Sequence, residues 1–211
     1  MGLKVTFALA VPVAALAAYA CWPRTADLRS FDPPAMARLE TAMWRDYYEK
    51  RYSALFTDLY QSSRTQFAFS PLASLRIALS AAQAAKGFQP TRSRTEAEIA
   101  IPDLVTYYDL LRPAAPVAFD SKTVASRELD WWQARRESVG PHEYGVTIGK
   151  VAALTYGKPE DDPALRAYGV SRAGAMAYRD ALGEAMTEND WSVIETQLRG
   201  AYQQLKMAIG N

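Results

Sequence analysis

The side chains that most often carry out chemistry are scarce in this sequence. Among its 211 residues there is one histidine, His142, and one cysteine, Cys21. A hydrolase triad needs a base beside its nucleophile, and a structural zinc site needs several Cys or His ligands, so neither is expected. Covalent haem attachment needs C-x-x-C-H, which does not occur. Because His142 follows Gly140-Pro141 at an expected helix start, we expect it to be a surface or capping residue.

Carboxylates are the remaining candidates for chemistry. A di-metal centre in a helical bundle takes carboxylates from facing helices together with Glu-x-x-His pairs. No Glu-x-x-His occurs, although acidic residues fall on several expected helices, namely Glu40, Glu128, Glu143, Asp180, Glu184 and Glu195. An enzyme that uses carboxylates alone, as glycosidases do, fits this inventory, but no spacing indicates one. We therefore expect no catalytic residue, no metal and no cofactor.

The charge balance and the glycines argue against two further classes of ligand. Lys and Arg number 24 against 23 Asp and Glu, a formal charge of +1, which gives no electrostatic basis for binding nucleic acid. No phosphate-binding glycine loop is found. Gly145 and Gly149 lie inside a helical pattern instead, and they indicate close packing of two helices.

Two segments combine aromatic and charged residues in the way that protein interfaces do. Partner contact is one interpretation, and a helix with a packed side and an ion-paired solvated side is the other, since Asp46 and Lys50 are four residues apart. Adjacent residues on a helix point about 100° apart, so only one tryptophan of the pair Trp131-Trp132 is expected to enter the core. The candidate partner-contact residues are Trp44, Arg45, Tyr48, Arg51, Trp131, Trp132, Arg135 and Arg136.

A polar loop at an expected helix start carries two further basic residues. Arg92 and Arg94 flank Ser93, and they are candidates for contact with an anion or a lipid headgroup. The alternative is a structural role in which they pair with Glu96 or Glu98.

The N-terminal stretch from Val5 to Pro23 carries no charged residue. As a helix it would be about 28 Å long, close to the thickness of the hydrocarbon core of a bilayer. Three interpretations compete. They are an uncleaved single-pass anchor with Trp22 and Arg24 at the membrane interface, a signal peptide cleaved after Ala20, and a lipoprotein acylated on Cys21. We favour an anchor in the cytoplasmic (inner) membrane with the following domain on the periplasmic side, although the count of basic flanking residues favours the opposite orientation.

The chain divides into three parts on this pattern. Residues 1–22 form the anchor or signal segment, residues 23–34 a Pro-containing linker, and residues 35–211 a helical domain. The linker would be extended up to about 35 Å or folded back. Three- and four-residue apolar spacing, bounded by Gly, Pro and capping residues, predicts an all-α fold, an irregular bundle of about seven helices preceded by a single N-terminal transmembrane helix. The expected helices cover residues 35–62, 71–87, 93–112 with a restart at Pro102, 121–137, 142–156, 163–186 and 190–209. Their expected N-caps include Ser70, Ser93, either Asp120 or Ser121, and Asp190.

Four stretches of the helical domain resemble a group of uncharacterised bacterial proteins of similar length. These stretches are Leu39–Tyr52, Phe67–Arg76, Phe88–Arg94 and Glu128–Glu137. The resemblance implies an all-helical protein that is exported or membrane-associated, and it brings no assigned chemistry with it.

These observations together predict a non-catalytic, membrane-anchored accessory or stabilising subunit. Its partners would be the lipid bilayer, through the N-terminal segment, and protein subunits of a larger bacterial membrane complex, respiratory or photosynthetic. The alternative is a free-standing exported helical domain that binds a small molecule or peptide between its helices.

Overall fold

The computed structural model describes residues 18–20, 22 and 24–210. Within that part the chain is all-helical and has no strand, which confirms the expected fold class. The transmembrane helix predicted ahead of the bundle lies mostly outside the described residues. The α-helices are α2 (Pro33–Tyr48), α3 (Tyr52–Gln66), α4 (Pro71–Phe88), α5 (Arg94–Ala97), α6 (Ile101–Leu111), α7 (Ser121–Arg136), α8 (Pro141–Tyr156), α9 (Pro163–Leu182) and α10 (Glu188–Ile209).

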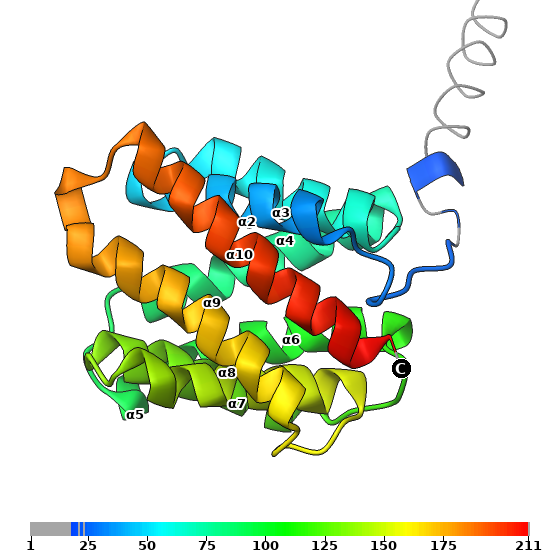
Figure 1. The fold of residues 1–211 in the computed structure, drawn as a ribbon. Helices are drawn as coiled ribbons and strands as arrows, with labels where there is room; N and C mark the ends of the chain where they lie inside the picture. Colours follow the sequence, from blue (N-terminus) through cyan, green and yellow to red (C-terminus); the bar gives the residue numbers. More distant parts are fainter. Residues whose placement is uncertain (1–17, 21, 23, 211) are drawn as a thin grey trace, which may run out of the picture.

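The helices form two layers joined by the last two helices of the chain. Helices α2, α3 and α4 lie on one side and α6, α7 and α8 on the other, while α9 and α10 cross one face between them (Figure 1). One core cluster gathers around α2, α8, α9 and α10, with Ile194 and Met176 fully enclosed. A second gathers around α4, α6 and α7, with Leu129 at its centre. Trp132 and Val151 contact both clusters, so the domain has one continuous interior.

Helix starts follow the local sequence closely. Ser70 and Ser93 cap α4 and α5 as predicted, and of the two candidates for the cap of α7 the structure has Asp120 and not Ser121. Each cap accepts a hydrogen bond from a backbone N–H of the first turn. The predicted cap of the last helix was three residues late. Thr187 is the N-cap of α10, and Asp190 at the third helical position accepts a hydrogen bond from the Thr187 backbone N–H at 2.9 Å, which completes a capping box.

The described part contains nine α-helices rather than about seven, and one cause is a break in the first expected helix. The chain reverses between Tyr48 and Tyr52, where Lys50 adopts a left-handed φ of 59°. Arg51 fixes the reversal, because its backbone N–H donates to the Asp46 carbonyl at 2.8 Å and its Nε donates to the Asp46 carboxylate at 2.8 Å. The apolar spacing continues across this turn, so it resembled one long helix.

The described part of the predicted linker is folded back onto the domain. Leu28 and Phe31 are buried in the core. The Leu28 backbone N–H donates to the Ala114 carbonyl at 2.9 Å, the Tyr156 hydroxyl donates to the Leu28 carbonyl at 3.0 Å, and Lys206 Nζ donates to the Phe31 carbonyl at 3.0 Å. Three separate helical regions therefore hold this segment, and α2 begins directly after it at Pro33.

Glycines set the contact between α8 and α9, as the sequence indicated for Gly145 and Gly149. A methyl group added at Gly149 would lie 2.7 Å from the Leu165 carbonyl oxygen, and one at Gly145 would lie 2.7 Å from Val170 Cα. Gly169 on α9 completes the contact, because its added methyl would lie 2.1 Å from the Gly145 carbonyl oxygen. The two backbones touch directly here, and no side chain separates them.

The Gly149→Ala variant should lower the free energy of unfolding by about 3 kcal/mol, because the new methyl group meets backbone atoms that cannot rotate away. Gly174→Ala is the matched control on α9, since a methyl group there meets nothing within 4 Å. That variant should raise stability by about 1 kcal/mol through helix propensity. Urea unfolding followed by circular dichroism measures both, and equal effects of the two changes would contradict this account.

Candidate functional site

The four α7 residues predicted to contact a partner are engaged within the chain. Trp131 is buried, and the Trp132 ring meets Phe88 edge-on at 5.2 Å between centroids. Arg135 donates to Asp180 at 2.8 Å and to the Tyr48 hydroxyl at 2.7 Å. Arg136 donates to the Phe88 carbonyl at 3.0 Å, where it satisfies the C-terminal end of α4. These side chains therefore bind α7 to α4, α9 and α2.

The four predicted contact residues on and after α2 are also engaged. Trp44 and Tyr48 are half-buried against the core, and the Arg179 guanidinium lies over the Tyr48 ring at 3.1 Å. Arg45 pairs with Glu49 at 2.9 Å and with Glu188 on α10. Arg51 pairs with Asp46, as described above, and with Glu49 at 2.7 Å.

The structure thus joins Tyr48 to Arg135, but it does not gather the eight residues on one free surface. Partner contact through them stays a prediction. The largest exposed apolar side chains near this segment are Tyr47 and Tyr52, which have 39% and 53% of their surfaces accessible. The sequence did not identify these two residues, because the spacing of aromatic residues does not show which of their side chains are exposed at the turn between α2 and α3.

The predicted anion-contact residues lie in an ion-paired loop. Arg94 pairs with Asp130 at 3.0 Å and with Glu98 at 3.5 Å. The Arg92 backbone N–H donates to the Glu96 carboxylate at 2.8 Å. The structure therefore contains the ion pair between Arg94 and Glu98 that the sequence offered as the alternative to anion binding.

The predicted membrane-interface residues line an open groove of about 340 Å³ at the start of α4. Trp22 is 67% accessible, and the Arg24 guanidinium lies over the Tyr19 ring at 5.0 Å. The opposite wall of the groove is formed by Phe69, Ser70, Ala73, Leu110 and Pro113, among others. This arrangement places the end of the uncharged N-terminal stretch beside the first turn of α4.

A buried ion pair that the sequence did not reveal lies between α2 and α9. Arg172 Nε donates to Glu40 Oε1 at 2.9 Å, and the Tyr202 hydroxyl donates to Glu40 Oε2 at 2.6 Å. Burial, together with the Glu40 carboxylate, raises the pKa of the Tyr202 hydroxyl well above its ordinary value. The Arg172 guanidinium also lies 5.4 Å from the centre of the Trp131 ring.

A half-buried carboxylate, Glu128, joins α6 and α7. Glu128 accepts hydrogen bonds at 3.0 Å from the Tyr108 hydroxyl and at 3.0 Å from Trp132 Nε1. Burial and the Glu128 charge raise the pKa of Tyr108 well above its ordinary value. In both clusters the carboxylate accepts hydrogen bonds from the groups around it, which favours a structural role over a catalytic one.

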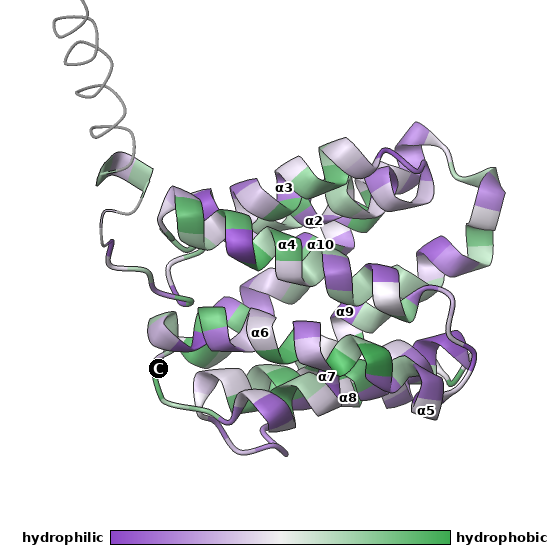
Figure 2. Cartoon of the chain, turned by 180° about the vertical axis from the view of Figure 1, so that it is seen from behind, coloured by the Kyte–Doolittle hydropathy of each residue, from purple (hydrophilic) through white to green (hydrophobic). Residues whose placement is uncertain are grey.

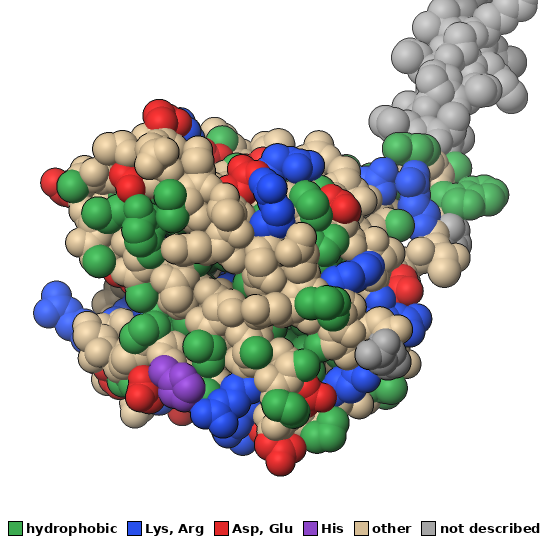
Figure 3. Space-filling view, viewed as in Figure 1, with side chains coloured by type: hydrophobic (Ala, Val, Ile, Leu, Met, Phe, Trp, Pro, Cys, Tyr) green, Lys and Arg blue, Asp and Glu red, His purple; other side chains and the backbone are tan. Residues whose placement is uncertain are grey.

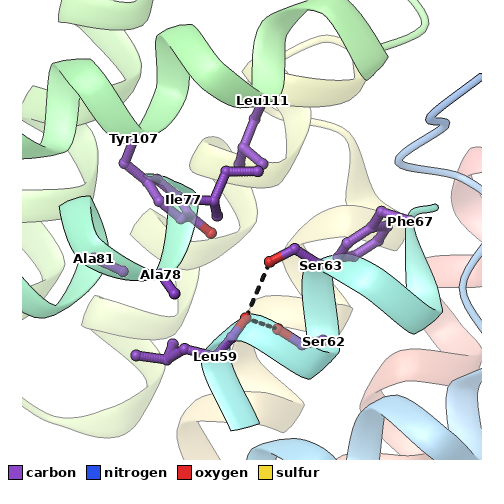
Figure 4. Close-up of a pocket in the computed structure, with 9 residues that line it drawn as sticks. All are labelled: Leu59, Ser62, Ser63, Phe67, Ile77, Ala78, Ala81, Tyr107 and Leu111. Carbon is purple, nitrogen blue, oxygen red and sulfur yellow. Dashed lines mark hydrogen bonds between the residues drawn. The ribbon is translucent and has the colours of Figure 1, made fainter. Parts of the chain in front are cut away.

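A small cavity between α3, α4 and α6 is lined by Leu59, Ser63, Ile77 and Tyr107, among others (Figure 4). Ser62 and Ser63 both donate to the Leu59 carbonyl, at 2.9 and 3.0 Å, so their hydroxyls are already used. Its volume of about 30 Å³ suits one water molecule and not an organic ligand.

No group of three or more His, Cys, Asp or Glu side chains among the described residues is arranged to hold a metal ion. The single histidine, His142, is exposed at the surface as expected, and its Nε2 lies 3.1 Å from Arg166 Nη2 (Figure 3).

Comparison with known proteins gives no relative. No protein-family model, no curated protein and no solved structure matches this chain. Among the helices of the described residues, none combines the length and apolar character needed to cross a bilayer. The predicted anchor, residues 1–22, lies mainly outside that part.

The buried ion pair gives a double-variant prediction. Arg172→Met should lower the free energy of unfolding by about 3 kcal/mol, because it leaves the Glu40 carboxylate buried without its cation. Adding Glu40→Gln removes that charge and keeps an acceptor for Tyr202, so most of the loss should be recovered. Urea unfolding of the wild type, both single variants and the double variant measures the coupling. If the losses of the two single variants simply add up in the double variant, Arg172 and Glu40 are not energetically coupled and this account is wrong.

The buried tyrosines predict a loss of stability in alkali. Burial raises the pKa of Tyr168 to about 12, against about 10 in the unfolded chain. Between these values the unfolded chain loses the proton first, so Tyr168 makes stability fall by about 1.4 kcal/mol per pH unit. Tyr168→Phe should remove that contribution to the slope. The measurement is urea unfolding at pH 9 to 12, and an unchanged slope in the variant would contradict the assignment.

Proposed function

We propose that this chain is a non-catalytic accessory subunit, anchored in a membrane by its N-terminal segment, whose helical domain docks on a larger bacterial membrane complex. The uncharged stretch from Val5 to Pro23 supports the anchor. The internal pairing of the candidate arginines and buried carboxylates supports a structural role for the domain. Respiratory and photosynthetic complexes are hosts that suit such a subunit.

The observation that carries the docking proposal is the turn between α2 and α3. Tyr47 and Tyr52 stand exposed on either side of it, and the Tyr47 ring rests edge-on against Tyr48 at 5.2 Å between centroids. Because Asp46 and Arg51 fix the turn, the backbone positions of both tyrosines are fixed as well. Exposed tyrosines beside basic groups are typical of protein interfaces. We call Tyr47, Lys50, Arg51 and Tyr52 the tyrosine turn.

The position of the tyrosine turn also suits a docking role. Figure 1 shows it at the end of α2 that is remote from residues 18–20 and Trp22. Helix α2 has 16 residues, so it separates the turn from the N-terminal segment by about 24 Å along its axis. A partner held at this distance would meet the turn without meeting the proposed anchor.

The alternative is a free-standing exported domain that binds a small molecule or peptide. The groove beside Trp22 favours it, since about 340 Å³ is within the usual range for ligand sites. The groove is open along its length, however, and binding sites for small molecules are normally enclosed. This difference favours the docking subunit.

Tyr47→Ala combined with Tyr52→Ala should abolish co-purification with the host complex, because it removes both exposed rings of the tyrosine turn and leaves the core intact. Ile99→Ala is the matched control, since Ile99 is highly exposed on the 3₁₀ turn ahead of α6. Native mass spectrometry of membranes solubilised in mild detergent reports partners and processing together. If the wild-type chain runs alone and lacks the residues up to Ala20, the proposed function is wrong.

A further inference from the structure

Helix α4 exposes a row of leucines on the side that faces away from the domain. Leu72, Leu75 and Leu79 have 44%, 46% and 47% of their surfaces accessible, and their three- and four-residue spacing aligns them on one face. Figure 2 shows α4 on the face of the molecule opposite to the view of Figure 1. We call these three residues the leucine row.

The leucine row is not the core face of α4. The core face carries Ser74, Ile77, Ala78 and Ala84, which are buried against α3 and α6. Helix α4 is therefore apolar on two opposite sides, whereas a surface helix is normally charged on the side away from the core. A second apolar side indicates a second apolar environment.

The place of the row in the fold indicates which environment that is. The groove that contains Trp22 is walled by Phe69, Ser70 and Ala73, so the uncharged N-terminal stretch ends beside the first turn of α4. Leu72 belongs to the same turn. Leu79 lies about 10 Å further along the helix axis, so the whole row is close to the point where the proposed anchor meets the domain.

The charges on α4 are complementary to an anionic surface. Arg76 is exposed next to Leu75, and Lys86 is exposed near the C-terminal end of the helix. The helix contains no Asp or Glu between Pro71 and Phe88. Leucines flanked by basic residues and free of acidic ones are the pattern of helices that lie in the headgroup region of anionic membranes.

We propose that α4 lies flat on the bilayer surface, with the leucine row in the interfacial region and Arg76 and Lys86 at anionic headgroups. This proposal rests on the proposed function in one respect, which is that the N-terminal segment holds the domain at the membrane. It adds a second membrane contact and thereby fixes which side of the domain faces the lipid.

Site-directed spin labelling of the full chain tests the proposal. In a Cys21→Ser background, a label at Leu75→Cys is compared with a matched label at Met207→Cys, an exposed apolar position on α10. The chain is reconstituted into vesicles of phosphatidylcholine and phosphatidylglycerol, and the collision rates of each label with oxygen and with a water-soluble nickel complex are measured. The label at position 75 should have a several-fold higher oxygen-to-nickel ratio than the label at position 207.

The outcomes separate this proposal from the proposed function. If the chain stays in the vesicles through a carbonate wash but both labels have the same low ratio, the anchor stands and the α4 contact is wrong. If the chain is released, the anchor and the α4 contact are both wrong. If the label at position 75 is shielded from both reagents and shows spin–spin broadening, a second copy covers the leucine row and the lipid assignment is overturned.

A second variant provides a functional readout. Leu72→Ser, Leu75→Ser and Leu79→Ser together leave the core face of α4 unchanged, so the domain should stay folded. The triple variant should remain in phosphatidylglycerol vesicles after the wash, but a label at Arg76→Cys should become several-fold more accessible to the nickel complex than in the chain with the leucines. Unchanged accessibility would contradict the proposal.

Discussion

The Glu40 carboxylate is the group on which the arrangement of the helices depends most. It joins three elements that are far apart in sequence, because α2 supplies the carboxylate, α9 supplies Arg172 and α10 supplies Tyr202. The Arg172 guanidinium extends the connection to α7 through the face of Trp131. A buried charge of this kind tolerates few alternative packings, since any arrangement that separates the pair leaves an ion without a partner. The layers made by α2 and by α7 and α8 are thereby fixed relative to each other.

Local signals in the sequence were sufficient for most of the helices. Ser70, Ser93 and Asp120 act within one helical turn, so their caps could be predicted without knowledge of the fold. Close packing of another helix at Gly145 and Gly149 could be predicted as well, because glycine inside a helix favours it, but that the other helix is α9 could not. The turn at Lys50 could not, since it depends on the side chain of Arg51 reaching back to Asp46. The Glu40–Arg172 pair was also out of reach, because the two residues are joined only by the tertiary fold.

The candidate site, too, could be predicted only in part from the sequence. Sequence pattern located the aromatic and basic segment around Trp44 to Tyr52, but it could not tell which of these side chains the domain itself would use. Arg45 and Arg135 pair with carboxylates on other helices. Arg51 pairs with carboxylates at the end of α2, and Arg136 donates to backbone carbonyls at the end of α4. Tyr47 and Tyr52, in contrast, stay exposed and could meet a partner. The two proposed contacts, the tyrosine turn and the leucine row of α4, therefore rest on exposure in the folded chain. They lie on different parts of the domain, so one need not block the other.

The folded-back segment between Arg24 and Asp32 has a mechanical consequence. Its backbone is hydrogen-bonded to Ala114, Tyr156 and Lys206, so the segment is fixed to the domain and is not a flexible linker. A domain on a flexible linker adopts many orientations, and only a few of them allow it to bind a larger assembly. In the proposed anchored subunit, a segment held in this way would limit the orientations that the domain adopts relative to the membrane. Part of the rotational entropy that association would otherwise cost would then be lost before a partner binds.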